Sequence, residues 1–77
     1  MDELALVIGQ NIRKRRKERG LTQDDFALVS KIDRSYIGRI ERGEANLTVE
    51  KLYIIAAVLD CEPSSLLPSK AILRAGQ

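Results

Sequence analysis

The fold of this chain is decided by residues 21–43, which read LTQDDFALVSKIDRSYIGRIERG. Thr22 is a good N-cap, because its hydroxyl can accept a hydrogen bond from the free N–H groups of a first helical turn, and Asp25 comes close to completing a capping box. Asp33 is a second N-cap candidate, so a new helix is predicted to begin at Arg34. The stretch therefore predicts two short helices joined by a tight turn.

The second of these helices has one apolar and one polar side. Its apolar positions, spaced as on a packed helical face, are Tyr36, Ile37 and Ile40. Its polar side carries Arg34, Ser35 and Arg39. So short a helix is not stable alone in water and depends on packing against the rest of the domain. The pattern is that of a helix-turn-helix, which places its second helix in the DNA major groove.

These residues resemble the lambda-repressor/Cro type of helix-turn-helix family. The resemblance is carried by LTQDDFA, S-x-I-D-R-S-Y-I and IERG, and it continues through IRKRRKERG before them and NLTVEKLYIIAAVLDCEPSSLL after them. Within the family, D-R-S-Y-I-x-x-I-E-R-G followed by N-L-T is most similar to the controller proteins of restriction–modification systems. The resemblance implies an all-α, compact five-helix domain and a homodimeric transcriptional regulator that binds a palindromic operator in double-stranded DNA.

Two alternative functions share much of the same pattern. One is a phage-type repressor, because phage repressors carry most of these residues. The other is an antitoxin-like protein-interaction module, because some antitoxins use this fold to bind DNA while also holding a toxin. The sequence shows no long extension that would wrap such a partner. Controller proteins often act as both activator and repressor by occupying adjacent operators, so the resemblance leaves both roles open.

Two residues depart from the family pattern. Lys31 lies in the turn where the family usually has Gly, and a side chain at positive φ costs on the order of 1 kcal/mol there. We expect mild strain, and a changed turn geometry would alter the direction of the second helix. Gly38 lies in the middle of the second helix, where Gly costs roughly 1 kcal/mol against Ala. Simple tolerance of this Gly and close approach of its backbone to a base remain equally open.

Candidate DNA contacts cluster on the two helices. Arg34 is in the first turn of the second helix, where Arg most often reads guanine through O6 and N7. Ser35 and Arg39 are further candidates for base contact, with a solvent-exposed or phosphate-only role as the alternative for each Arg. Gln23 begins the first helix, where free N–H groups suit a phosphate, and the resemblance implies a DNA-backbone contact for it. Further phosphate candidates are Tyr36, Arg42 and Asn46.

One basic residue is assigned a structural role. Residues 13–19 contain six basic side chains and one Glu, a run that can attract phosphate or simply face solvent. In the resembling family, the Arg four residues before Gly20 pairs with the Glu of the I-E-x-G motif. The resemblance therefore implies a salt bridge between Arg16 and Glu41 that ties the first helix to the recognition helix. The alternative role for Arg16 is contact with DNA.

The remaining elements predict a dimer. We expect a first helix over residues 3–19, a fourth helix after Thr48, and a fifth that Pro63 begins and Pro68 ends. The fourth helix has more apolar surface than one small core needs. The predicted dimer interface comprises Ile54, Ala57, Val58, Leu66 and Leu67, with Ile72 and Leu73 as possible additions. The alternative is that these side chains only thicken the core. Residues 1–68 then form the DNA-binding and dimerising domain, and residues 69–77 form a short tail.

Composition argues against several other classes of protein. The 77 residues contain no His and one Cys, with a net charge of +2. They offer no metal-ligand cluster, no Gly-rich phosphate loop and no paired nucleophile and base, so we expect neither an enzyme nor a cofactor, metal or small-molecule ligand. No apolar run approaches the roughly 20 residues of a membrane span, and the start has no basic region typical of a signal peptide. A cytoplasmic protein is expected.

Overall fold

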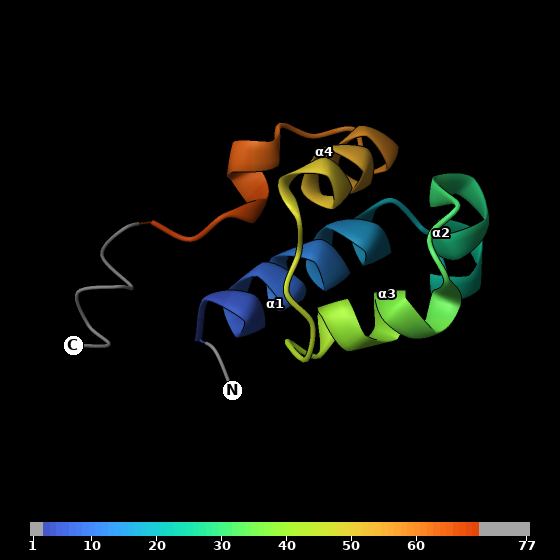
Figure 1. Cartoon of the computed structure of the whole chain (residues 1–77). Coiled ribbons are helices and arrows are strands. Elements are labelled where there is room, and N and C mark those ends of the chain that lie inside the picture. The colour runs from blue at the N-terminus through green and yellow to red at the C-terminus, as the bar shows by residue number, and fades with distance from the viewer. Residues whose placement is uncertain (1–2, 70–77) are drawn as a thin grey trace.

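The computed structural model of the chain describes residues 3–69, and within them the backbone forms helices and no strand (Figure 1). The elements are α1 (Glu3–Glu18), α2 (Gln23–Ser30), α3 (Arg34–Glu41) and α4 (Val49–Val58), followed by one 3₁₀ turn, η1 (Pro63–Leu66). The all-α fold is as predicted, with the helix-turn-helix formed by α2 and α3.

The predicted fifth α-helix is wrong, because η1 is a single 3₁₀ turn. The N–H of Ser65 donates to the carbonyl of Glu62 at 2.9 Å, and that of Leu67 donates to Ser64 at 3.2 Å. Leu67 precedes Pro68, whose ring disfavours helical backbone in the residue before it. Leu67 is accordingly extended, with φ −95° and ψ 143°. The second proline therefore stops the segment before an α-helix can form.

One apolar core holds the elements together. α1 runs through the middle of the view in Figure 1 and packs on α3 and η1, while α2 packs on α3 and α4. Each helix, the α2–α3 turn and η1 contribute a buried side chain. The buried apolar residues are Ile12, Phe26, Ile32, Ile37, Ile40, Ile55, Ala56, Leu59 and Leu66. No helix within residues 3–69 has the length and apolarity needed to cross a membrane.

Leu66 is a correction to the predicted dimer interface. Its side chain is only 2% exposed, because η1 folds back and inserts it into the core. The carbonyl of Leu66 also accepts a hydrogen bond from Nδ2 of Asn11 at 3.0 Å, which holds η1 against α1. Leu66 therefore supports the fold from inside and is not available to a second copy. Ile72 and Leu73 lie outside the described residues.

Side-chain caps define where the helices of the motif begin. Thr22 Oγ1 accepts from the N–H of Asp25 at 3.0 Å, and the Asp25 carboxylate accepts from the N–H of Thr22 at 3.1 Å, which completes the capping box. Asp33 Oδ1 accepts from the N–H of Ser35 at 2.8 Å. Thr48 caps α4 in the same way. Each such cap contributes about 1 kcal/mol to stability.

The turn between α2 and α3 uses the left-handed backbone predicted for Lys31. Its φ is 61° and its ψ is 27°, and its N–H donates to the carbonyl of Ala27 at 2.9 Å. The side chain is exposed, so the strain is confined to the backbone. Ile32 follows directly and fills the corner between the helices, with 5% of its surface exposed. The chain therefore keeps the usual turn geometry despite the Lys.

Gly9 sets the distance between α1 and α3. A Cβ atom built at Gly9 would lie 2.3 Å from the carbonyl oxygen of Ile40 and 2.9 Å from that of Glu41, both backbone atoms. A Cβ at Gly38 would instead meet Nη1 of Arg42 at 3.1 Å, the far end of a flexible side chain. Only the first of these glycines is required by close contact with backbone.

The two glycines therefore differ in their response to alanine. We expect Gly9→Ala to destabilise the fold by roughly 1–3 kcal/mol or more, because two helix backbones must move apart. Gly38→Ala should leave stability unchanged or raise it by up to about 1 kcal/mol, because Ala is the better helix former. Urea denaturation followed by circular dichroism measures both. Equal losses in the two variants would contradict the close approach of α1 to α3.

Candidate nucleic-acid interface

The recognition-helix candidate α3 is buried on one side and open on the other. Its buried side consists of Ile37, Gly38, Ile40 and Glu41. The exposed side carries Arg34, Ser35 and Arg39, the three residues predicted to contact bases. Tyr36 is half-buried between the two sides, and its hydroxyl donates to the carbonyl of Asn46 at 3.0 Å. The inner side fixes the helix, so the outer side is free to meet a ligand.

At the start of α3, two polar side chains contact acidic neighbours. Nε of Arg34 donates to Oδ1 of Asp24 at 2.9 Å, which joins the first turns of α3 and α2. Ser35 Oγ donates to Oδ1 of Asp33 at 2.6 Å. Together with the N–H of Ser35, this hydrogen bond lowers the pKa of the Asp33 carboxyl below its ordinary value. These contacts give Arg34 and Ser35 defined positions before any DNA is bound.

At the other end of α3, Glu44 gathers two arginines. Its carboxylate forms an ion pair with Arg42, with Oε1 3.1 Å from Nε, and its backbone carbonyl accepts from Nη2 of Arg39 at 3.5 Å. All three side chains are exposed to solvent. Exposed ion pairs of this kind contribute little to stability and are readily exchanged for other partners. Both arginines therefore remain able to turn to a phosphate or a base.

A buried ion pair lies behind α3. Nε and Nη2 of Arg16 donate to the two carboxylate oxygens of Glu41 at 2.7 and 2.9 Å. Both residues are only 7% exposed. Nη1 of Arg16 donates to the carbonyl of Leu21 at 2.7 Å, and Nε2 of Gln23 donates to Glu41 at 3.1 Å. The hydrogen bonds from Arg16 to Glu41 raise the pKa of Arg16, although burial opposes the shift. This is the pair that the family resemblance implies.

Gln23 and Arg42 meet at a polar hollow in front of that pair. The hollow has a volume of about 390 Å³ and is lined by Arg13, Arg16, Gln23, Glu41 and Arg42. It lies at the N-terminus of α2, where backbone N–H groups lack helical partners. Arg16 is neutralised by Glu41, and Arg42 is paired with the exposed Glu44, so the hollow's positive charge comes from Arg13 and from Arg42 when it exchanges Glu44 for another anion. This arrangement suits an anion.

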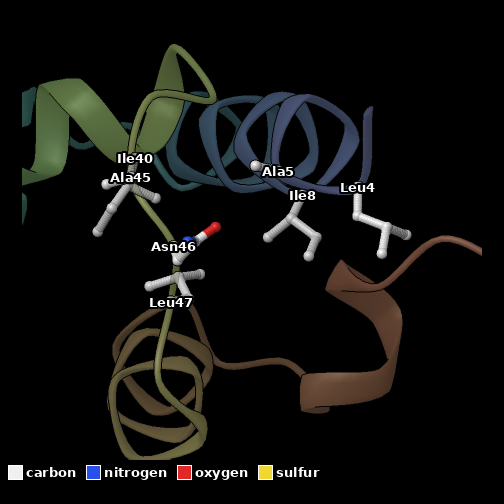
Figure 2. Close-up of a pocket in the computed structure, with 7 residues that line it drawn as sticks. All are labelled: Leu4, Ala5, Ile8, Ile40, Ala45, Asn46 and Leu47. Atoms are coloured by element: carbon white, nitrogen blue, oxygen red, sulfur yellow. The ribbon is translucent and has the colours of Figure 1, made fainter. Parts of the chain in front are cut away.

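Asn46 belongs to a different surface. It lines an apolar groove of about 290 Å³ together with residues from the first turns of α1 and the chain after α3 (Figure 2). The other lining residues are Leu4, Ala5, Ile8, Ile40, Ala45 and Leu47. Asn46 has the one polar side chain among these lining residues. The structure therefore brings Gln23 and Arg42 together but leaves Asn46 on a separate wall.

Three residues make contacts that the sequence pattern does not indicate. Asp24 and Glu44 were not singled out, although each contacts an Arg of the candidate interface. Arg15 was counted only as part of the basic run, yet its Nε and Nη2 donate to the carbonyls of Leu59 and Asp60. No group of three or more metal-ligating side chains occurs among the residues that the structure describes.

Comparison with known proteins gives the same helix-turn-helix pattern over most of the chain. Residues 12–66 match the family model HTH_3, described as helix-turn-helix. The control protein C.SmaI of Serratia marcescens is 33% identical over 66 residues, which cover 86% of this chain and 79% of that protein. The crystal structure of the restriction–modification controller protein C.AhdI from Aeromonas hydrophila superposes with a TM-score of 0.79 and 38% identity, over 82% of this chain and 96% of that one.

A second solved structure includes DNA. The restriction–modification controller protein C.Esp1396I, solved as a tetramer in complex with its natural 35 base-pair operator, is similar to this chain with a TM-score of 0.78 and 36% identity. The match covers 86% of this chain and 87% of that one.

The buried pair should behave as one unit in folding. We expect Arg16→Ala and Glu41→Ala each to destabilise the protein by ~3–5 kcal/mol, because either change leaves the other charge buried without its partner. The double variant should lose much less than the sum, and a double-mutant cycle by chemical denaturation measures this coupling. Lys17→Ala, an exposed change in the same basic run, is the control and should be close to neutral. A coupling near zero would return Arg16 to the candidates for DNA contact.

Proposed function

The chain belongs to the helix-turn-helix family, and on this basis we propose that it is a sequence-specific, homodimeric regulator of transcription, most similar to the controller proteins of restriction–modification systems. Its partner is double-stranded DNA with a palindromic operator. The similar proteins reported above are control and controller proteins rather than enzymes, and we propose the same non-catalytic role here.

The observation that carries this proposal is the two-sided construction of α3. Ile37 and Ile40 of the helix pack in the apolar core and Glu41 pairs with Arg16, while the exposed side presents Arg34, Ser35 and Arg39. Arg in the first turn of a recognition helix suits guanine, which offers O6 and N7 as paired acceptors. Ser35 and Arg39 are the further base contacts we propose.

Phosphate contacts would surround this helix. The polar hollow at the start of α2 places Gln23 and Arg42 beside free backbone N–H groups, which favour a phosphate. The hydroxyl of Tyr36 donates to a carbonyl in the free protein and would exchange that acceptor for a phosphate. Asn46, on the rim of the apolar groove, is the fourth proposed contact. Such contacts hold the recognition helix in register but read no sequence.

The proposed dimer uses the exposed part of α4 and the chain after η1. Ala57 is exposed and Leu67 is 43% exposed, while Ile54 and Val58 are half-buried against the core. Val49 and Tyr53, at 71% and 60% exposed, continue the line of Ala57 along α4 at intervals of four residues. An apolar stripe of this kind is suited to meet its own copy across a two-fold axis. We propose residues 1–68 as the DNA-binding and dimerising domain.

Selection of bound duplexes from a random DNA pool tests the function. The native chain should enrich an inverted repeat, and its affinity should fall steeply with salt because phosphate contacts release counterions. Arg34→Ala should weaken binding to the enriched duplex by ~1–3 kcal/mol and relax the preference at one base pair in each half. Gln23→Ala should weaken all sequences about equally. Arg19→Ala, an exposed change outside α2 and α3, is the control: it removes one charge of the basic run, so it should weaken all sequences slightly and change the preference at no base pair. If Arg34→Ala leaves affinity and preference intact, the assignment of α3 is wrong.

Sedimentation tests the dimer separately. The native chain at micromolar concentration should sediment as a dimer, with recognition helices ~34–36 Å apart on DNA. Ala57→Glu and Leu67→Glu should give folded monomers, because each places a charge on an apolar contact without entering the core. Ser64→Glu, on the exposed part of η1, is the matched control and should remain dimeric. A native chain that is monomeric both free and on DNA would refute the interface.

A further inference from the structure

Asp24 and Arg34 form a contact across the corner of the helix-turn-helix that the fold does not require. Asp24 lies in the first turn of α2 and Arg34 in the first turn of α3, and Nε of Arg34 is 2.9 Å from Oδ1 of Asp24. Both side chains are largely exposed, at 81% and 59%. An ion pair so open to water adds little to folding stability. The main effect of this ion pair is therefore on the orientation of the Arg34 guanidinium.

The contact occupies one particular part of Arg34. A guanidinium is a rigid plane with five N–H donors, one on Nε and four on the two terminal nitrogens. Asp24 accepts from Nε. The two terminal nitrogens at the end of the fork remain available, and they form the pair of donors that matches guanine O6 and N7. Asp24 thus binds Nε of Arg34 and leaves the two terminal nitrogens free to bind a base.

Helix electrostatics favour the same arrangement. The N-terminus of a helix carries partial positive charge, so an anion there is stabilised and a cation is destabilised. Asp24 is well placed in the first turn of α2, whereas Arg34 is poorly placed in the first turn of α3. Asp24 is the acid that Arg34 contacts, whereas the other acid at this end of α3, Asp33, is bonded to Ser35. Without Asp24, the Arg34 side chain would be free to swing toward the nearest phosphate.

We infer that Asp24 is a positioning residue for base recognition, which holds Arg34 through Nε so that its terminal nitrogens meet guanine end-on. The carboxylate also repels DNA phosphates, which discourages Arg34 from settling on the backbone of unrelated sequences. Asp24 therefore raises the ratio of specific to non-specific binding without touching the base itself. This inference rests on the function proposed above.

The experiment compares discrimination between base pairs in variants of the 77-residue chain. Its probes are the duplex that the native chain enriches and the same duplex substituted at each base pair in turn. The variants are Asp24→Ala, Asp24→Asn, Arg34→Ala and the double variant Asp24→Ala with Arg34→Ala. The matched control is Asp60→Asn. Asp60 is also an exposed acid beside an arginine, at 3.8 Å from Arg19 with its side chain 80% exposed. Its left-handed backbone, with φ 55°, is one that Asn tolerates.

Positioning predicts a change at one base pair. Asp24→Ala should reduce discrimination roughly threefold to tenfold at the base pair whose preference Arg34→Ala relaxes, and at no other. Asp24→Asn should retain most of it, because its amide oxygen can still accept from Nε. In the double variant, the loss at that base pair should be no greater than in Arg34→Ala alone. Asp60→Asn should leave the whole profile unchanged.

The outcomes that overturn the inference are distinct. If Asp24→Ala binds every duplex more tightly by the same factor and keeps its discrimination, Asp24 acts only as a charge. A loss of discrimination that persists when Arg34 is already Ala would show that Asp24 does not act through Arg34. A native chain that enriches no sequence overturns the proposed function, and this inference with it. Enrichment by the native chain together with unchanged discrimination in Asp24→Ala overturns the inference alone.

Discussion

The buried pair of Arg16 and Glu41 is the interaction on which the position of the recognition helix depends. A charge taken out of water is stable only when its partners are complete, and here those partners come from three directions. Glu41 belongs to α3 and Arg16 to α1, while Gln23 of α2 and the carbonyl of Leu21 satisfy the remaining donors and acceptors. Because any displacement of α3 would break this set, the pair selects one orientation of the helix among those the apolar core would accept.

Close backbone contact adds a second restraint to the same helix. Gly9 admits the carbonyls at the end of α3, and Gly43, with φ 76°, lies where a Cβ would be 2.8 Å from the backbone of Leu6. α1 therefore holds the C-terminal end of α3, through close contact of Gly9 with the backbone of Ile40 and Glu41 and through the charge pair of Arg16 with Glu41. An eight-residue helix has little stability of its own, so these contacts from behind replace what its length cannot supply.

Local rules account for most of what the sequence predicted, and tertiary contacts account for what it missed. Thr22 and Asp33 mark helix starts through side chains that act within three residues, so their effect can be read directly. The burial of Leu66 depends on how η1 folds back on α1, and the spacing of apolar residues in the sequence does not indicate this. The Asp24–Arg34 contact joins residues ten apart on two helices and leaves no repeating pattern. In the sequence, Gly9 is simply a residue that destabilises a helix interior, because its close contact with the backbone of α3 appears only in the structure.

The shortness of α3 limits how much information one copy can extract from DNA. Eight residues span about 12 Å at the rise of an α-helix. That length faces only three or four base pairs at ~3.4 Å each. A DNA sequence of three or four base pairs recurs by chance roughly every 64 to 256 base pairs. The exposed residues of α3 that would read this sequence take little part in the core, so they can be substituted without disturbing the fold. A protein of this design can therefore acquire specificity for a different DNA sequence through very few substitutions.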